Sequence, residues 1–313
     1  MRPLKIIKNR SDIGAGTRGS DMGIDALEIA AINAHNDFFN RHPYLDLKTH
    51  NETIYNKVNH PFAKRIGAVL EQCLRVREAT KVVLKEGFFP LILSGDHSSA
   101  LGSMAGLQQA FPQDMLGVIW IDAHTDLHAP LSTPSGNVHG MPLGAALGMN
   151  HETLAINAFE KETHQHWEGL KQLGTTKPFL QPQQLVYFGI RDYEAQEATL
   201  LDQLSLRFFE VEYCRAVGVA QSAQEALAYL AACDKLYVSF DVDVFDADTV
   251  SVGTGTPVSA GFTKREILTL LQSLLADKRV IALEVAEINP LLDQKGNSMA
   301  EAAFEVLVQL FEE

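Results

Sequence analysis

The sequence predicts one α/β domain in which a central, mostly parallel β-sheet lies between two layers of helices. Apolar, β-rich segments alternate along the chain with longer segments whose apolar residues recur at three-to-four spacing, as expected for strands joined by helices. The chain has 313 residues and 46% hydrophobic content, which suffices for a large core. No repeat or linker divides residues 1–313, so we expect a single catalytic domain.

The strand assignments rest on short apolar segments, several of them apolar without interruption. Continuous apolar character is typical of strands that are buried on both faces of a parallel sheet. The segments are Leu4–Ile7, Leu91–Leu93, Val118–Ile121, Leu185–Ile190, Phe208–Val211, Leu236–Phe240 and Val280–Ile288.

The helix assignments rest on apolar periodicity and on one capping signal. Thr263 is followed three residues later by Glu266, the capping-box pattern that marks the start of a helix. The segments with helical periodicity are Gly23–Ala30, Ile66–Leu84, Ser98–Ala110, Ala223–Ala232, Thr263–Leu275 and Ala300–Phe311.

A polar stretch over residues 150–184 has no clear periodicity. We expect it to form a helix and a surface connection beside the site. Its histidines, His151, His164 and His166, are expected to be solvated rather than to bind metal.

Charge and composition exclude some classes of partner. The formal net charge of −13 argues against nucleic-acid and anionic-membrane binding, since both need dense Lys and Arg patches, and it suits a small cationic substrate better. The N-terminal residues lack an apolar signal region and no apolar stretch is long enough to span a bilayer, so we expect a cytoplasmic protein. The three cysteines, Cys73, Cys214 and Cys233, are expected to be buried thiols.

Imidazoles and carboxylates follow three of the predicted strands. Ligands of an open parallel sheet gather at the carboxyl ends of its strands, so these segments can meet in one crevice. Side chains of an extended strand alternate between faces, so Asp122, His124 and Asp126 would point the same way if the extended backbone persists. The candidate metal ligands are His97, Asp122, His124, Asp126, Asp241 and Asp243.

The composition of this set predicts its chemistry. Buried carboxylates are costly unless they are paired or bind metal. A site rich in carboxylates with fewer imidazoles favours a hard ion such as Mn²⁺ over structural zinc. Two such ions can share a bridging water, acidify it to hydroxide and direct it at an electrophilic carbon. We therefore expect metal-assisted hydrolysis.

Several motifs together resemble the ureohydrolase (arginase–agmatinase) family, and within it the arginases, which share an α/β/α fold with metal-dependent deacetylases. They appear in family order from about residue 90 onward, with a weaker match at Gly14–Gly19. The matching segments are Ser94–Ser98, Asp122–Asp126, Ser135–Pro142, Gly189–Asp192, Ser239–Asp246, Thr254–Pro257 and Glu287–Pro290.

The resemblance implies two Mn²⁺ ions per chain. One ion would be bound by His97, Asp122, Asp126 and Asp241, and the other by Asp122, His124, Asp241 and Asp243. A metal-bridging hydroxide would attack the guanidinium carbon of L-arginine, and the products would be L-ornithine and urea. Asp126 would also carry a proton to the departing amine.

The resemblance also implies roles for residues around the metals. His139 would be a mobile proton shuttle, as suits an imidazole, and Glu287 would receive the guanidinium group. The candidates for contacts with the α-carboxylate and α-ammonium groups of the substrate are His128, Ser135, Asn137, Glu194 and Glu197.

The sequence departs from the arginase pattern without losing a metal ligand. His128 stands where an asparagine is usual, and Glu194 where an aspartate is usual, both on the substrate side. Ser94 replaces a glycine, Ala247 replaces a proline, and one extra residue precedes Thr254. Substrate identity is therefore less strongly predicted than reaction type.

Three alternatives stay open. The first is another ureohydrolase, namely an agmatinase, a guanidinobutyrase or a formimidoylglutamase, although Ser135 and Asn137 argue for a substrate with an α-carboxylate. The second is a deacetylase with one zinc ion, and the third is a catalytically silent binding or regulatory subunit. The family further suggests a homo-oligomer, a trimer or a hexamer.

Overall fold

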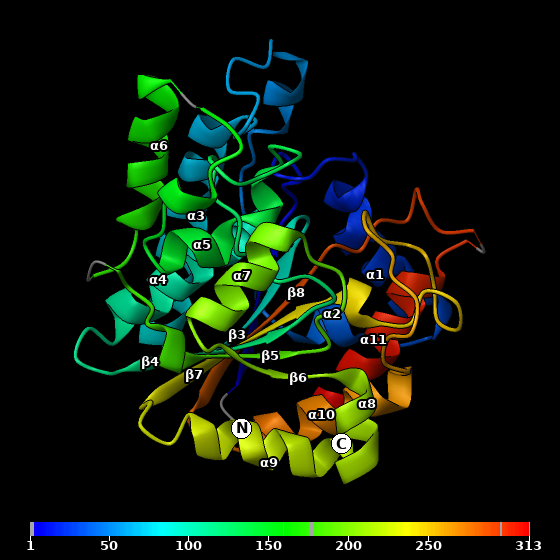
Figure 1. Cartoon of the computed structure of the whole chain (residues 1–313). Coiled ribbons are helices and arrows are strands. Elements are labelled where there is room, and N and C mark those ends of the chain that lie inside the picture. The colour runs from blue at the N-terminus through cyan, green and yellow to red at the C-terminus, as the bar shows by residue number, and fades with distance from the viewer. Residues whose placement is uncertain (1–2, 159, 176–177, 295, 313) are drawn as a thin grey trace.

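A computed structural model describes residues 3–158, 160–175, 178–294 and 296–312. Its centre is an eight-stranded sheet in the order β2-β1-β3-β8-β7-β4-β5-β6 (Figure 1). Every paired strand is parallel. The start of the N-terminal stretch and parts of the 150–184 connection lie outside the described residues.

The strands of the sheet are β1 (Leu4–Asn9), β2 (Tyr44–Asp46), β3 (Phe89–Ser94), β4 (Leu116–Ile121), β5 (Leu185–Phe188), β6 (Arg207–Phe209), β7 (Lys235–Asp241) and β8 (Val280–Ala286). The α-helices are α1 (Gly23–Asn33), α2 (Phe38–Arg41), α3 (Ile66–Lys85), α4 (Ala100–Ala110), α5 (Pro142–Ala146), α6 (Lys161–Lys171), α7 (Ala195–Gln203), α8 (Val211–Val217), α9 (Val219–Tyr229), α10 (Lys264–Leu275) and α11 (Ser298–Phe311).

The predicted fold class is confirmed, and all seven predicted strands are present. The capping box also forms, because Thr263 N donates to Glu266 Oε2 at 2.8 Å and the Glu266 N–H donates back to Thr263 Oγ1 at 3.3 Å. The sequence reading missed β2, α2, α5, α7 and α8. These elements are short, and a segment of three to nine residues shows too few turns or alternations to reveal its period.

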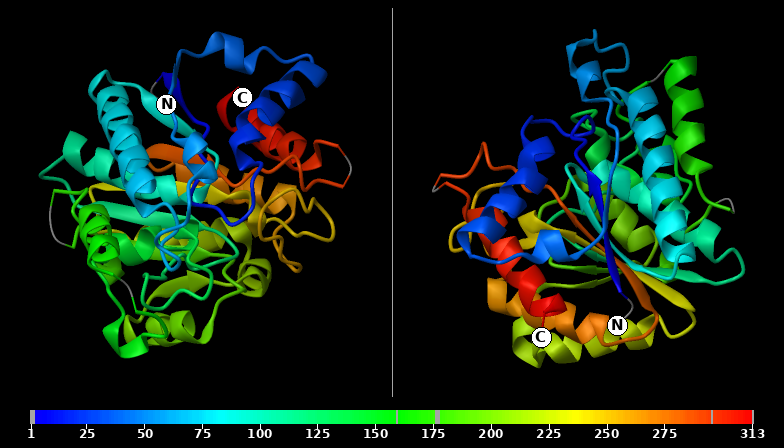
Figure 2. Two further views of the ribbon diagram at one scale, coloured as in Figure 1. Left: turned by 90° about the horizontal axis from the view of Figure 1, so that it is seen from above. Right: turned by 180° about the vertical axis from the view of Figure 1, so that it is seen from behind.

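Each face of the sheet is covered by its own layer of helices (Figure 2). One core packs α1, α8, α9, α10 and α11 against the sheet, and the other packs α3, α4, α5, α6 and α7 against the opposite face. Neighbouring strand residues such as Ile6 and Ile7 belong to different cores, as the alternation of side chains in a strand requires. The chain is therefore a three-layer α/β/α structure.

Strand order decides which loops meet at the carboxyl edge of the sheet. Strands β7 and β4 are neighbours, and β8 is the single strand between β3 and β7. The segments after these four strands are therefore brought together, although they are distant in sequence.

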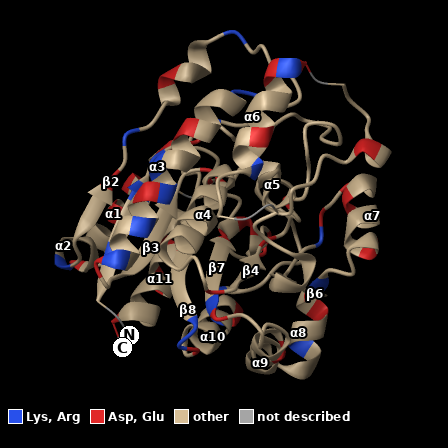
Figure 3. Cartoon of the chain, turned by 90° about the vertical axis from the view of Figure 1, so that its left-hand side faces the viewer, with Lys and Arg blue, Asp and Glu red and all other residues tan. Residues whose placement is uncertain are grey.

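On the side of the molecule shown in Figure 3, acidic and basic residues are interspersed along the ribbon of α3. Among the described residues, no helix has both the length and the apolar character needed to cross a membrane.

Candidate active site

The candidate metal ligands begin where three strands end, but the backbone does not stay extended as we expected. His97 opens a 3₁₀ turn after β3, and Asp243 lies in the 3₁₀ turn Val242–Val244 after β7. Asp126 has a φ of 52°, a left-handed conformation that is uncommon outside glycine. The side chains therefore converge because tight turns direct them inward rather than because strand alternation continues.

The first ligand group surrounds the imidazole of His97, which is 1% exposed. Its Nδ1 atom lies 3.1 Å from Asp122 Oδ2, 3.2 Å from Asp126 Oδ2 and 3.1 Å from Asp241 Oδ2. Within the described part of the chain, Nδ1 makes no hydrogen bond of acceptable geometry. Three carboxylate oxygens thus crowd around one nitrogen, as the ligands of a cation do.

The second ligand group surrounds His124. Its Nδ1 lies 2.8 Å from Asp243 Oδ2 and 3.6 Å from Asp122 Oδ1. Asp122 therefore presents one oxygen to each histidine, as expected of a carboxylate that bridges two ions. The structure brings together all six predicted ligands.

Surrounding groups hold these ligands in place. Ser239 Oγ lies 2.7 Å from His97 Nε2, and Trp120 stacks on the His97 ring with centroids 4.1 Å apart. The Trp120 indole also donates to Asp122 Oδ2 at 2.9 Å. Hydrogen bonds to the second nitrogen of a ligating histidine fix its tautomer and leave the first nitrogen free for a metal.

The acidic cluster is electrostatically unfavourable without a cation. Burial, and then repulsion by the Asp243 and Asp122 carboxylates, raise the pKa of Asp241 well above its usual range. Divalent cations between these oxygens would remove that repulsion and stabilise the ionised forms. The donor chemistry, the unpartnered His97 nitrogen and the crowding of carboxylates all fit a metal centre.

The partly buried His139 pairs with the buried Glu287 beside the first ligand group. His139 Nδ1 lies 2.9 Å from Glu287 Oε1, and the same oxygen accepts the backbone N–H of His97 at 2.9 Å. Burial alone would lower the pKa of His139, but the Glu287, Asp126 and Asp96 carboxylates together outweigh this effect and raise that pKa to about 9. Glu287 has a φ of 69°, so its placement costs backbone strain.

The ligands form the floor of a cavity of about 240 Å³. Its walls include His139 and every predicted substrate contact, whereas Glu287 lies behind His139 and does not line the cavity. The lining residues are His97, His124, Asp126, His128, Ser135, Asn137, His139, Gly140, Asp192, Glu194, Glu197, Asp241, Asp243 and Thr256.

One wall of the cavity carries His128 and two glutamates. His128 Nε2 lies 2.9 Å from Glu194 Oε2 and 3.4 Å from Glu197 Oε2. The hydrogen bond to His128 lowers the pKa of Glu194, whereas burial, and then Glu194, raise the pKa of Glu197. The two glutamates also form the capping box that starts α7, so a helix N-terminus fixes their positions.

The expectation that His151 is solvated is wrong. Its side chain is buried, and Nδ1 lies 2.8 Å from Ser132 Oγ, which in turn lies 3.2 Å from His128 Nδ1. Burial, and then the His128 imidazole, lower the pKa of His151 to about 4. The polar sequence around residue 151 concealed this, because only the tertiary fold shows that the residue lies behind the cavity wall.

Ser135 and Asn137 also line the cavity. The Lys64 ammonium donates to Asn137 Oδ1 at 3.0 Å, and Ser135 Oγ accepts the backbone N–H of Asn137 at 3.2 Å. The sequence did not indicate Lys64 as a residue of the site, because it precedes α3 and belongs to no recognised motif. The sequence also did not indicate Ser239 or Trp120 as orienting groups, although both lie within two residues of a predicted ligand.

Comparisons with known proteins identify the family to which this sequence and fold are similar. The model of the arginase family matches residues 4–312. Two curated relatives are the arginase of Bacillus subtilis (strain 168), 32% identical over 99% of this chain and 97% of the relative, and that of Bacillus caldovelox, 30% identical over 100% and 99%. The solved B. caldovelox arginase covers 100% of this chain and 99% of its own with a TM-score of 0.82.

The fold alone does not determine the substrate, as a more distant structure shows. The formimidoylglutamase of Bacillus subtilis subsp. subtilis str. 168 shares the fold at 17% identity, with a TM-score of 0.73, over 100% of this chain and 87% of its own. Similarity to such a structure says nothing of substrate. The resemblance found in the motifs is confirmed by the family match and by relatives that are hydrolases of guanidino C–N bonds. The chain belongs to the arginase family.

Proposed function

We propose that the protein is a manganese-dependent arginase that hydrolyses L-arginine to L-ornithine and urea. The observation that carries this proposal is the pair of histidine–carboxylate groups that share Asp122 at the floor of a cavity with polar walls. The residues that would hold two Mn²⁺ ions are His97, Asp122, His124, Asp126, Asp241 and Asp243. When bound, such ions lower the pKa of water and supply hydroxide as a nucleophile near neutral pH.

The chain's own residues would bind and orient the substrate. A guanidinium group at the cavity floor would meet an environment rich in carboxylates, which suits a planar cation with five N–H donors. At the other end of the substrate, Glu194 and Glu197 would accept hydrogen bonds from the α-ammonium group. Ser135 and Asn137 would donate hydrogen bonds to the α-carboxylate. L-Arginine carries all three groups.

His139 supports the proposal as a proton carrier. Its ring lines the cavity and its Nδ1 hydrogen-bonds to Glu287 Oε1 at 2.9 Å, which leaves Nε2 to exchange a proton with the cavity. Glu287 would act by orienting His139, since it contacts that ring and does not line the cavity. Asp126, which lines the cavity, would pass a proton to the leaving amine.

The decisive experiment is a substrate panel with the Mn²⁺-loaded protein, in which urea is measured from L-arginine, agmatine and guanidinobutyrate, and formamide from formimidoylglutamate. We expect kcat/KM to be highest for L-arginine. A preference for agmatine would show that Ser135 and Asn137 do not bind a carboxylate. Metal content adds a second criterion, because about two ions per chain fit an arginase and one fits a deacetylase.

Another ureohydrolase activity is the alternative, because His128 and Glu194, which depart from the arginase pattern, pair with each other in the lining of the cavity. An agmatinase, a guanidinobutyrase or a formimidoylglutamase would use the same metal ligands. We further propose that the protein acts in the cytoplasm and that it is a homo-oligomer. Sedimentation or light scattering would test the oligomeric state.

A further inference from the structure

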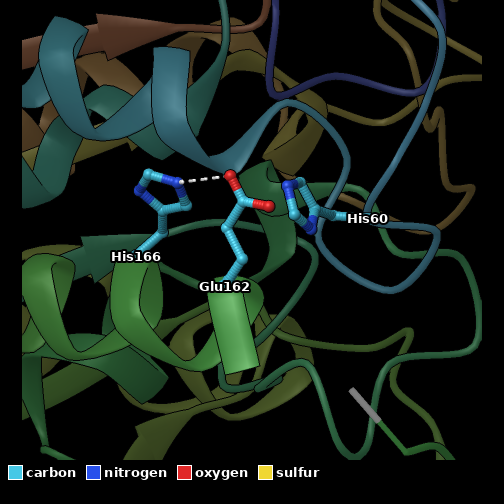
Figure 4. Close-up of side chains that lie close together, drawn as sticks. All are labelled: His60, Glu162 and His166. Atoms are coloured by element: carbon cyan, nitrogen blue, oxygen red, sulfur yellow. Dashed lines mark ion pairs between the residues drawn. The ribbon is translucent and has the colours of Figure 1, made fainter. Parts of the chain in front are cut away.

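We propose that His60, Glu162 and His166 form a peripheral site for a divalent transition-metal ion such as Zn²⁺. The cluster lies outside the arginase-like cavity, on the helical layer that contains α3 and α6 (Figure 4). Glu162 and His166 are four residues apart on α6, so they share one face of that helix. His60 comes from the loop before α3, about a hundred residues earlier in the chain.

The geometry brings three ligand atoms together. One atom from each residue lies within 4.8 Å of the other two, and the Glu162 carboxylate lies between the two imidazole rings (Figure 4). A tetrahedral zinc ion with bonds of about 2.0–2.1 Å needs its ligand atoms roughly 3.3 Å apart. Glu162 is 66% exposed, so its carboxylate can make this small adjustment.

The two histidines are held in place by other contacts. His60 Nδ1 lies 2.8 Å from Thr163 Oγ1. When Nδ1–H donates to that hydroxyl, Nε2 keeps its lone pair for a metal, as in many histidine-ligated sites. The His166 ring lies against Gly67, where an added Cβ would be only 3.1 Å from its Cε1 atom.

The donor set selects the class of ion. Two imidazoles and one carboxylate suit Zn²⁺, Co²⁺ or Ni²⁺ better than the carboxylate-rich groups of the main cavity do. The site borders a cavity of about 320 Å³, which gives ions and water access from solvent. A water molecule can complete the coordination.

A bound ion would connect α6 to the loop that contains His60. That loop contacts Gly136, which lies beside the main site. His60 precedes Pro61, whose carbonyl oxygen would lie 1.9 Å from any Cβ at Gly136. Gly136 separates Ser135 from Asn137, and its carbonyl accepts the backbone N–H of Lys64 at 2.8 Å. Zinc at the peripheral site would therefore tie α6 to the loop that supports the predicted carboxylate-binding wall.

The test is a count of two metals on one sample. Protein saturated with Mn²⁺ is dialysed against Zn²⁺ with Mn²⁺ kept in excess, and both metals are measured by plasma mass spectrometry. We expect uptake of about one Zn²⁺ per chain with no loss of Mn²⁺. His60→Asn and His166→Asn should lose that zinc, while His164→Asn, on the same helix but outside the cluster, should keep it.

Two further measurements, of zinc affinity and of Tm, test the proposal independently. Thr163→Val removes only the hydroxyl that orients His60, and should weaken zinc binding roughly ten- to a hundred-fold. Zinc should raise the Tm of the wild type and of His164→Asn, but not of His60→Asn. Zinc uptake that displaces an equal amount of Mn²⁺, or that persists in His60→Asn, would overturn the proposal, as would the absence of uptake by the wild type.

Discussion

Lys64 donates a hydrogen bond from Nζ to Oδ1 of Asn137 at 3.0 Å, and so determines which way the Asn137 amide faces. An ammonium group can only donate, so the atom beside it must be the amide oxygen. The amide nitrogen is then free to donate elsewhere. Asn137 lines the cavity, which makes Lys64 a positioning residue for the wall that would bind a carboxylate.

The first prediction concerns this pair. Lys64→Met should raise KM for L-arginine about ten-fold with little change in kcat, because losing a charge-assisted hydrogen bond costs about 1.5 kcal/mol. KM for agmatine, which has no α-carboxylate, should stay the same. The exposed Lys85→Met serves as the matched control. An equal effect on both substrates would mean that Lys64 acts on the whole cavity rather than on Asn137.

The second prediction concerns Asp126, whose Oδ2 lies 3.2 Å from His97 Nδ1. Asp126→Asn replaces a charged oxygen by a neutral amide, so manganese occupancy and urea production should fall together. The exposed Asp25→Asn should change neither. Atomic absorption and a urea assay on the same preparation test this, and full activity of the Asp126 variant would remove the residue from the metal-binding set.

The third prediction separates proton transfer from metal binding. His139→Asn should lower kcat by roughly a hundred-fold or more, as expected for loss of a positioned acid–base group, while manganese content stays at the wild-type level. Added imidazole should restore part of the activity. Loss of metal from this variant would instead make His139 a ligand.

The fourth prediction concerns stability at acid pH. Burial and the His128 imidazole lower the pKa of His151 to about 4 in the folded chain, from 6.5 for the free side chain. Between these values the unfolded chain binds the proton more readily, so stability is fully present above about pH 6.5 and is lost as pH falls toward 4. At pH 5 the contribution lost is about 2 kcal/mol.

His151→Asn should therefore flatten the decline of the unfolding free energy between pH 7 and pH 5, measured by urea denaturation. The substitution also removes the hydrogen bond to Ser132, so the variant should be less stable than the wild type at pH 7. His164→Asn, on the exposed surface of α6, should leave the slope unchanged. Identical slopes for wild type and His151→Asn would show that His151 does not titrate in this range.

The sequence alone determined the fold class and the order of the main elements, and it predicted the six candidate metal ligands. Buried parallel strands need continuous apolar runs, and the polar residues after them mark strand ends, so both leave a clear local signal. Short elements such as β2 and α8 leave no such signal, because they are stabilised by packing against the rest of the fold and are too short to show a hydrophobic periodicity. The family match confirmed what the motif order had indicated.

Only the tertiary structure decided how the side chains meet. Strand order placed β8 between β3 and β7, which set Glu287 against His139 rather than in the cavity wall. It also buried His151 behind His128 and brought His60 to α6. These relationships join residues far apart in the chain. They depend on the packing of whole layers and the turns between them, which no local pattern of residues specifies.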